Sequence, residues 1–498
     1  MAENQIVYLI VFLIFIALMF VVGVLVSRNV KSGEDFLMGG RGLSIFLLTG
    51  TTVATLVGTG SSMGAVQFAY SNGWAGALYG IGGAVGVFAL LLLFADVRKL
   101  NFMTFSEELS YYFGASKLVK GLTSILLYVA SIGWLGTHIL GGSLYLSYIT
   151  GLEPTVSKLL VALGFTLFTI VGGYLSVVIT DVIQGFILFF GFAFLTVLSL
   201  VKVGGFSAIS EQMPDDATSF LGIQHIGFIP AISLIAVIAV GVLATPSYRQ
   251  RIYSSQNVAT VKKGFLITGI LFAIFSLFPS VAGMSAHILN PDIKSGFAFP
   301  YLATQVFPLW IGAIILISGL SATLSSGSSD YIAAVTILLR DVYQVFTGKV
   351  PRKEKMVLYS RISLVLTIIL AFGLVLGTTN IIGFISSFIS TVLSGLFVAS
   401  LLGKFWPRAN WQGGLASLIS GSAISLTVLS NDSLLAYLGN PILPSLIGAL
   451  VFGVIVSLVT PESKVSKEEA LRILDEERAV VDVGTQISHG PEEKSVNG

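Results

Sequence analysis

Hydrophobic residues gather in runs of membrane-spanning length along most of the chain. The runs lie near residues 5–27, 45–70, 74–95, 122–148, 156–174, 181–202, 228–248, 263–287, 305–338, 357–377, 380–402, 411–429 and 442–460. A helix of about 20 apolar residues crosses the roughly 30 Å hydrocarbon core of a bilayer. Alternating strands of about ten residues, typical of a membrane barrel, do not occur in the sequence. The pattern predicts an all-α integral membrane protein with about thirteen transmembrane helices.

The charged residues between these runs predict how the chain is oriented. Lysine and arginine collect in the loops after the first, third, seventh, ninth and eleventh runs, with Arg98, Arg249 and Lys404 as examples. Because basic loops stay in the cytoplasm, we expect an outside N-terminus, a cytoplasmic C-terminus and an odd number of helices. The first run lacks a basic leader and a small-residue cleavage site, so we interpret it as a retained helix of a multi-pass cell-membrane protein.

Composition narrows the classes of function. The chain has 498 residues, of which 54% are hydrophobic and 10% charged, and its mean hydropathy is +0.91. It contains no cysteine, phosphate-binding loop or nucleophile elbow, and its four histidines are scattered. The basic residues lie mainly in the loops predicted to be cytoplasmic and form no basic patch that would bind nucleic acid. We therefore expect neither an enzyme nor a nucleic-acid-binding protein.

The polar tail, residues 461–498, is too short for a signalling domain. A short amphipathic helix is expected near 466–480, with disorder after it. The sequence indicates no obligate protein partner.

A serine-rich stretch interrupts the apolar run at 305–338. Residues 320–330 carry six hydroxyls and the carboxylate of Asp330. At helical spacing Ala322, Ser325, Ser326 and Ser329 share one broad face with Asp330. Because membrane interiors tolerate such polarity only where it is buried and used, this helix is the first place to seek function. Oxygen ligands on one face favour a hard, weakly held cation such as sodium.

The run at 45–70 contains a second irregularity. Helix-weakening glycines alternate with small hydroxyl residues over 58–62. This composition is typical of a broken helix whose freed carbonyls face an ion or solute. Close helix packing through small residues is the alternative interpretation.

Three segments, in this order and spacing, resemble the solute:sodium symporter family of proline, sugar, sialic acid, pantothenate and choline carriers. They are 35–41, 172–185 and the serine-rich helix that ends in Arg340-Asp-Val-Tyr343. The resemblance implies a LeuT-like fold with an inverted five-helix repeat. We expect an N-terminal extra helix and loop at 1–44, a transport core at 45–403 divided into 45–202 and 228–403, and C-terminal extra helices at 404–460.

The resemblance also implies the ligands of a sodium site. They are the backbone carbonyls of Ala54, Val57 and Ala322 and the hydroxyls of Ser325 and Ser326. Such neutral oxygens can replace the water of a sodium ion without preventing its release. Serines that bond only to their own helix are the alternative.

A second sodium position, found in the sialic acid transporters, would use Asp181, Ser325, Ser328 and Ser329. Asp181 could instead cap a helix N-terminus. The role of Asp330 stays open among tuning sodium affinity, carrying a proton and pairing with a base.

The resemblance places the solute pocket at Thr59, Gly60, Trp134 and Thr245. His138, one helical turn from Trp134, either lines this pocket or is packed in the core. The pocket residues identify no particular solute.

These features predict sodium-coupled symport of a small organic solute across a lipid bilayer, with Na⁺ as the coupling ion. The main alternative is a proton-coupled symporter that uses Asp181 or Asp330. A passive channel and a sensor that binds without transport are further alternatives.

Overall fold

The computed structural model describes residues 2–27, 39–169, 174–348, 353–463 and 465–483. Parts of the predicted motifs at 35–41 and 172–185, and the predicted disorder at 484–498, lie outside the described residues. Within the described ranges the regular structure is helical, apart from one isolated bridge between Leu43 and Ser255. The all-α prediction is therefore confirmed.

The main helices are α1 (Ala2–Ser27), α3 (Ile45–Leu56), α4 (Ala65–Asn72), α5 (Ala77–Phe94), α7 (Lys117–Thr150), α8 (Pro154–Thr169), α9 (Tyr174–Val203), α13 (Phe228–Ala244), α14 (Pro246–Ser254), α15 (Val258–Phe275), α16 (Leu277–Leu289), α18 (Leu309–Ile337), α20 (Lys353–Leu374), α21 (Ile381–Phe405), α22 (Trp411–Leu429) and α24 (Ile442–Val459). The shorter helices are α6 (Phe105–Tyr112), α10 (Phe206–Gln212), α11 (Asp215–Thr218), α12 (Ile223–Ile226), α17 (Ala298–Tyr301), α19 (Tyr343–Thr347), α23 (Asp432–Leu438) and the tail helix α25 (Lys467–Val483). The described part of each predicted run lies mainly on one or two of these helices. Among the described residues nine helices are long and apolar enough to span a membrane, or ten with the bent pair α13–α14, so the count of thirteen stays a prediction.

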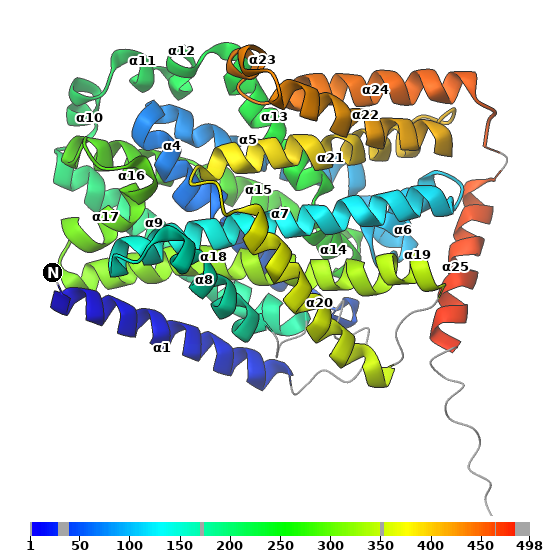
Figure 1. The fold of residues 1–498 in the computed structure, drawn as a ribbon, viewed down its shortest axis with the longest axis horizontal. Coiled ribbons are helices and arrows are strands. Elements are labelled where there is room, and N and C mark those ends of the chain that lie inside the picture. The colour runs from blue at the N-terminus through cyan, green and yellow to red at the C-terminus, as the bar shows by residue number, and fades with distance from the viewer. Residues whose placement is uncertain (1, 28–38, 170–173, 349–352, 464, 484–498) are drawn as a thin grey trace, which may run out of the picture.

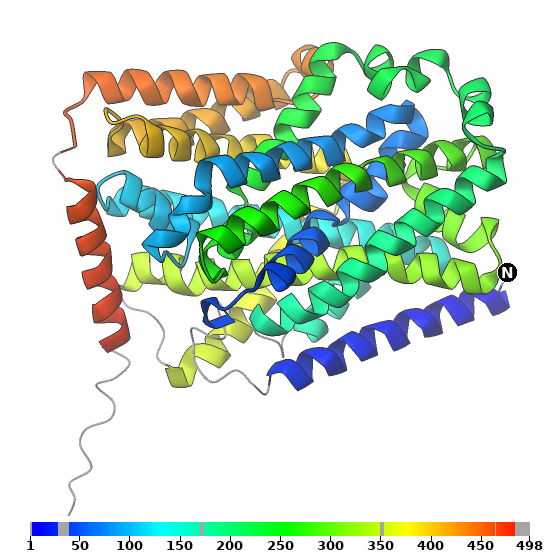
Figure 2. The ribbon, with the colours of Figure 1, turned by 180° about the vertical axis from the view of Figure 1, so that it is seen from behind.

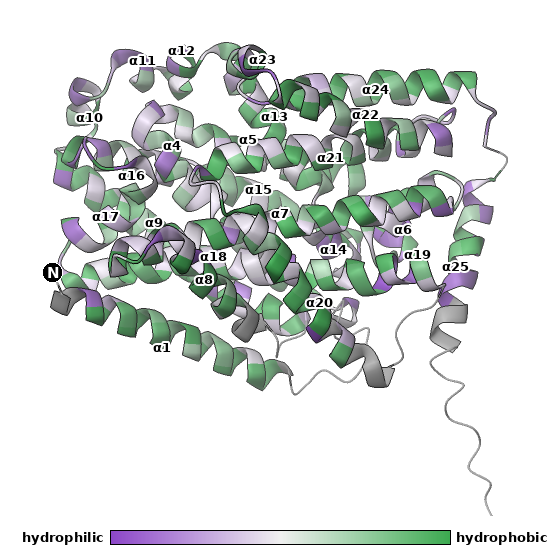
Figure 3. Cartoon of the chain, in the orientation of Figure 1, coloured by the Kyte–Doolittle hydropathy of each residue, from purple (hydrophilic) through white to green (hydrophobic). Residues whose placement is uncertain are grey.

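The main helices run mostly along the long axis of the molecule (Figure 1). The N-terminus lies at one end, and α25 crosses the other end. Apolar residues dominate the bundle helices (Figure 3). Large apolar side chains stay exposed on its outside, for example Leu18 at 56%, Phe190 at 64% and Val459 at 77%. Such an apolar outer surface suits a lipid environment.

Helix α18 carries the serine-rich stretch through the middle of the bundle. It packs on α3, α7 and α9, and every residue from Ser318 to Ile337 is buried. Viewed from behind, the short dark blue α3 lies near the centre of the molecule, where it packs on α9 and α15 (Figure 2). The polar helix and the interrupted helix therefore meet inside the protein, away from lipid.

Two interrupted helices open the two predicted repeats. In the first, α3 ends at Leu56 and the chain continues through a π-helical turn at Gly60–Gly64 into α4. In the second, α13 and α14 meet at a bend of 45°. Pro246 begins α14 and cannot continue the hydrogen bonding of α13, which explains the bend. The repeat boundaries at 45–202 and 228–403 remain a prediction.

Candidate functional site

The break after α3 aims backbone carbonyls at α18. Val57 ends the helix with φ −80° and ψ 55°, and it is fully buried. A Cβ atom at Gly58 would lie 2.6 Å from Ser326 Oγ, so only glycine allows the two helices to approach this closely. The predicted break in this helix is confirmed, and Gly58, which follows it, packs closely against Ser326 as the alternative interpretation also expects.

Two serines of α18 meet this broken end. Ser325 Oγ lies 2.9 Å from the Ala54 carbonyl oxygen and 3.4 Å from that of Ala322. Ser326 Oγ lies 2.9 Å from the Thr55 carbonyl oxygen and 3.3 Å from that of Ala54. We call Ala54, Thr55, Ala322, Ser325 and Ser326 the serine–carbonyl site. Ser325 Oγ also lies 2.7 Å from the Ser321 carbonyl oxygen of its own helix. Two hydroxyl hydrogens therefore face four carbonyl oxygens here, so oxygen lone pairs are left over for a cation.

The residues predicted for a second sodium position separate into two groups. Asp181 Oδ2 accepts from Thr51 Oγ1 at 2.6 Å and from Ser329 Oγ at 3.0 Å. Ser328 Oγ instead donates to the Ser325 carbonyl of its own helix at 3.0 Å. The structure therefore brings Asp181 and Ser329 together, and Ser328 faces elsewhere. A further residue, Arg251, also contacts Asp181, with its Nη2 atom 3.3 Å from Oδ2.

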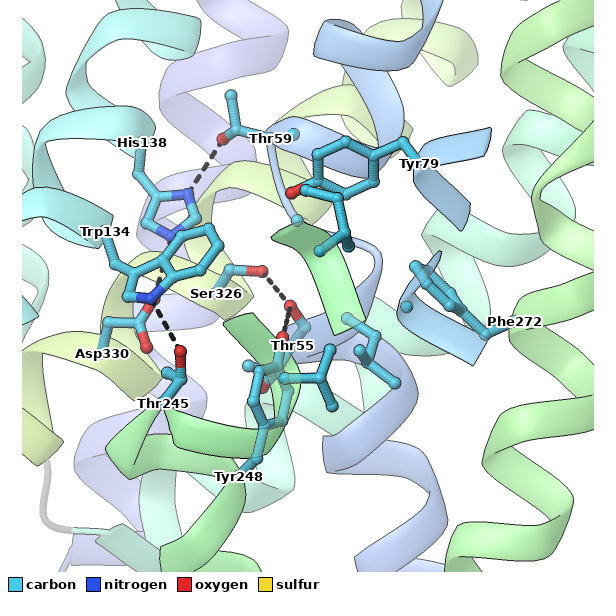
Figure 4. A pocket seen from close by; sticks show the side chains of 16 residues that line it. Thr55, Thr59, Tyr79, Trp134, His138, Thr245, Tyr248, Phe272, Ser326 and Asp330 are labelled. Carbon is cyan, nitrogen blue, oxygen red and sulfur yellow. Dashed lines mark hydrogen bonds and ion pairs between the residues drawn. The ribbon is translucent and has the colours of Figure 1, made fainter. Parts of the chain in front are cut away.

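All four predicted solute residues line one cavity next to the serine–carbonyl site (Figure 4). They are Thr59, Gly60, Trp134 and Thr245. The Trp134 indole nitrogen donates to Thr245 Oγ1 at 2.9 Å and so joins α7 to the bend between α13 and α14. The cavity measures about 20 Å³, which is room for about one water. The space at this position is therefore too small for an organic solute.

A buried histidine and carboxylate form one wall of the cavity. His138 Nε2 lies 3.1 Å from Asp330 Oδ2, and His138 Nδ1 lies 3.0 Å from Thr59 Oγ1. Both side chains are nearly inaccessible, at 3% and 6% exposure. These two contacts give each ring nitrogen of His138 a polar partner. His138 therefore lines the cavity, and Asp330 pairs with it.

A buried charged cluster lies between α6 and α14. Arg249 Nη1 donates to Glu108 Oε1 at 2.9 Å, and both side chains are fully buried. Tyr112 donates to the same carboxylate at 2.9 Å, and Tyr253 donates to its other oxygen. The guanidinium also stacks over Phe94, 3.6 Å from the ring centroid. These contacts join α6 to α14.

The tail helix α25 packs on α6. Arg478 pairs with Glu107 of α6 at 2.5 Å, and Glu477 pairs with Lys120 of α7 at 3.0 Å. Burial alone would lower the pKa of Arg478, but the hydrogen bond and charge of Glu107 outweigh it and raise the pKa. Leu474 is buried in this contact at 1% exposure. The predicted amphipathic helix is thus present, and it packs against the transport core.

Sequence reasoning missed the buried roles of Arg249, Arg251 and Glu108. The pattern of runs and charges predicts both arginines in a cytoplasmic loop, because they follow an apolar run. The signal that could have located them is Pro246, which starts a new helix and carries the arginines back into the protein. Glu108 lies 141 residues before Arg249, and Asp181 lies 70 residues before Arg251. Pairs so far apart leave no periodic pattern in the sequence.

Several known proteins resemble this chain in sequence or in fold. The chain is 29% identical over 467 residues to the sodium/pantothenate symporter of Haemophilus influenzae, covering 89% of this chain and 94% of the relative. It is 22% identical to the osmoregulated proline transporter of Bacillus subtilis, covering 90% and 94%. Among solved structures, a Na⁺-coupled sialic acid symporter in a substrate-bound outward-open state matches with a TM-score of 0.79 and 21% identity, covering 92% of this chain and 99% of the other.

The likeness to the sialic acid symporter establishes a shared fold, the LeuT-like arrangement expected above. The family model described as "Sodium:solute symporter family" matches residues 36–421, well over half of the chain. The chain belongs to the sodium:solute symporter family, whose members are multi-pass membrane proteins that carry small solutes together with sodium.

Proposed function

We propose that the serine–carbonyl site is where this symporter binds sodium. The observation that carries the proposal is the meeting of Ser325 and Ser326 with the carbonyls of Ala54 and Thr55 across the broken helix. The Ala322 carbonyl and the nearby Val57 complete a set of neutral oxygens, which suits an ion that must be released in every cycle. A bound ion would hold α3 and α18 together.

The neighbouring cavity is the proposed solute site. Ser326 lines both the cavity and the serine–carbonyl site, so an ion bound there fixes one wall of the solute position. The cavity holds one carboxylate, Asp330, and neither lysine nor arginine lines it. An anionic solute would therefore take its positive partner from sodium. Pantothenate, proline and choline, named for relatives, are the first solutes to assay.

Solute and ion enter from the outside in this proposal, and they leave towards the cytoplasm. The Glu108–Arg249 cluster closes the predicted cytoplasmic end, so its parting is the step that opens the inward path. In the proposed orientation the N-terminus lies outside and the C-terminus with α25 lies inside, as the positive-inside pattern of the loops predicts.

One sodium ion supplies enough energy for strong accumulation. A membrane potential of 100 mV gives about 2.3 kcal/mol per charge. A tenfold sodium gradient adds about 1.4 kcal/mol. Together these correspond to roughly 500-fold accumulation of a neutral solute per ion.

The test is uptake into proteoliposomes. Purified protein is reconstituted, an inward sodium gradient is imposed, and a panel of labelled pantothenate, proline, choline and glucose is offered. Saturable accumulation that collapses when sodium is replaced by potassium supports the proposal. Uptake that persists without sodium and follows a pH gradient would instead favour the proton-coupled alternative through Asp181 or Asp330. Flux without accumulation would indicate a channel.

A further inference from the structure

Five oxygen atoms surround a single nitrogen of Arg251. Its Nη2 atom lies 2.7 Å from Thr51 Oγ1, 2.9 Å from Ser329 Oγ, 3.2 Å from the Thr51 carbonyl oxygen and 3.3 Å from Asp181 Oδ2, and it also donates to Thr55 Oγ1. We call Thr51, Thr55, Asp181 and Ser329 the oxygen cage. One Nη2 atom carries two hydrogens, so it cannot bond to five oxygens at once. Five oxygens around one centre resemble the surroundings of a metal cation more than those of a guanidinium.

The pairing between the guanidinium and the carboxylate is incomplete. Asp181 Oδ1 and Arg251 Nε are both buried and have no hydrogen-bond partner among the described residues. Their side chains are 0% and 1% exposed. An arginine that pairs fully with a carboxylate uses two nitrogens and both oxygens. Arg251 instead enters the cage by one nitrogen, as a single positive charge.

The cage oxygens are also bonded to one another. Besides the two hydroxyls that donate to Asp181, Thr55 Oγ1 donates to Ser329 Oγ at 3.2 Å. These residues come from α3, α9 and α18, and Arg251 reaches them from α14, where its Nη1 is held by the Ser247 carbonyl at 2.8 Å. The cage would thus keep its oxygens together around another cation.

We propose that Arg251 is a tethered cation that fills a second cation position, so that the protein binds one sodium ion rather than two. The proposal rests on the sodium site proposed above, because that site supplies the one remaining ion. It also changes the interpretation of the predicted second position. Asp181 and Ser329 are there, but a charge fixed to the chain occupies it. Removing that charge should open the cage to a sodium ion.

The test counts bound sodium in the full-length protein and needs no solute. Binding of ²²Na⁺ to purified protein in nanodiscs is measured to saturation. We expect one ion for the wild type, two for Arg251→Gln and one for Arg251→Lys, which keeps a tethered charge. The double variant Asp181→Asn with Arg251→Gln, which removes both charges, should return to one ion. Size-exclusion chromatography verifies that each variant is folded.

Two ions bound to the wild type would overturn the proposal and leave the sodium site of the previous section intact. One ion bound to folded Arg251→Gln would overturn it as well. No saturable binding to the wild type would refute the sodium site itself, so the two failures are distinguishable.

If Arg251→Gln does not fold, Ser329→Ala decides the question. Its hydroxyl contacts the guanidinium, so the proposal expects one bound ion and a half-saturating sodium concentration within twofold of the wild type. A sodium affinity lowered tenfold or more would show that Ser329 holds an ion, and would overturn the proposal.

Discussion

Ser326→Ala offers the sharpest test of the serine–carbonyl site. The substitution removes a fully buried hydroxyl that lies 2.9 Å from the Thr55 carbonyl oxygen and faces the cavity. In the absence of sodium the loss is that of a neutral hydrogen bond, about 1 kcal/mol, which the fold can tolerate. With sodium bound the loss is that of a polar ligand to a charge, about 1.5–3 kcal/mol.

The difference between these two losses, about 0.5–2 kcal/mol, raises the half-saturating sodium concentration roughly 2- to 30-fold, since each 1.4 kcal/mol is tenfold. The maximal uptake rate at saturating sodium should change much less. The assay is ²²Na⁺ binding in nanodiscs, followed by uptake in proteoliposomes over a range of sodium concentrations with potassium as the replacement ion.

Ser318→Ala is the matched control for this variant. Ser318 is also buried on α18, about two turns from Ser326, and its hydroxyl lies 2.9 Å from the Ile314 carbonyl of its own helix and 3.3 Å from the Ile187 carbonyl of α9, away from the broken end of α3. The half-saturating sodium concentration of Ser318→Ala should stay within twofold of the wild-type value. Equal shifts in the two variants, or a shift below twofold in Ser326→Ala, would refute the assignment of Ser326 as a ligand.

Three more substitutions test other parts of the site. Gly58→Ala should weaken sodium binding at least tenfold in ²²Na⁺ titrations, because the new Cβ would lie 2.6 Å from Ser326 Oγ. Gly164→Ala is its control, since a Cβ at Gly164 meets nothing within 4 Å and should leave the titration unchanged. Trp134→Phe removes the indole hydrogen bond to Thr245, worth about 1 kcal/mol, and should raise the solute KM about fivefold. The number of sodium ions bound per protein should stay the same. Glu108→Gln leaves a buried guanidinium without its anion, at a cost of about 3–5 kcal/mol, and should lower the melting temperature measured in detergent.

Much of the fold was predictable because the bilayer imposes strong local rules. Apolar runs mark helices, and the glycine and hydroxyl pattern at 58–62 marks the break in α3. The serine face of α18 was equally visible, since its positions repeat at helical spacing. These signals are local, and each could be interpreted without knowing its neighbours in space.

The pairing of charges was not predictable in the same way. A carboxylate such as Asp181 can cap a helix, bind an ion or meet an arginine, and only the packing of α9 against α3 and α18 decides which. The same is true of Asp330, whose partner His138 comes from α7, 192 residues earlier. Tertiary contacts between distant segments carry this information, and a single sequence shows neither the contact nor its direction.

The small cavity beside Ser326 has an osmotic consequence. Sites that enclose organic ligands measure about 300–1,000 Å³, whereas this one measures about 20 Å³. Because protein interiors are close-packed, the helices must separate as rigid bodies to admit a solute, and bulk water fills the space that opens. Opening therefore hydrates the protein. Osmolytes too large to enter would draw that water out again, so a concentrated bathing solution should hold the carrier shut and slow its turnover even at saturating sodium and solute.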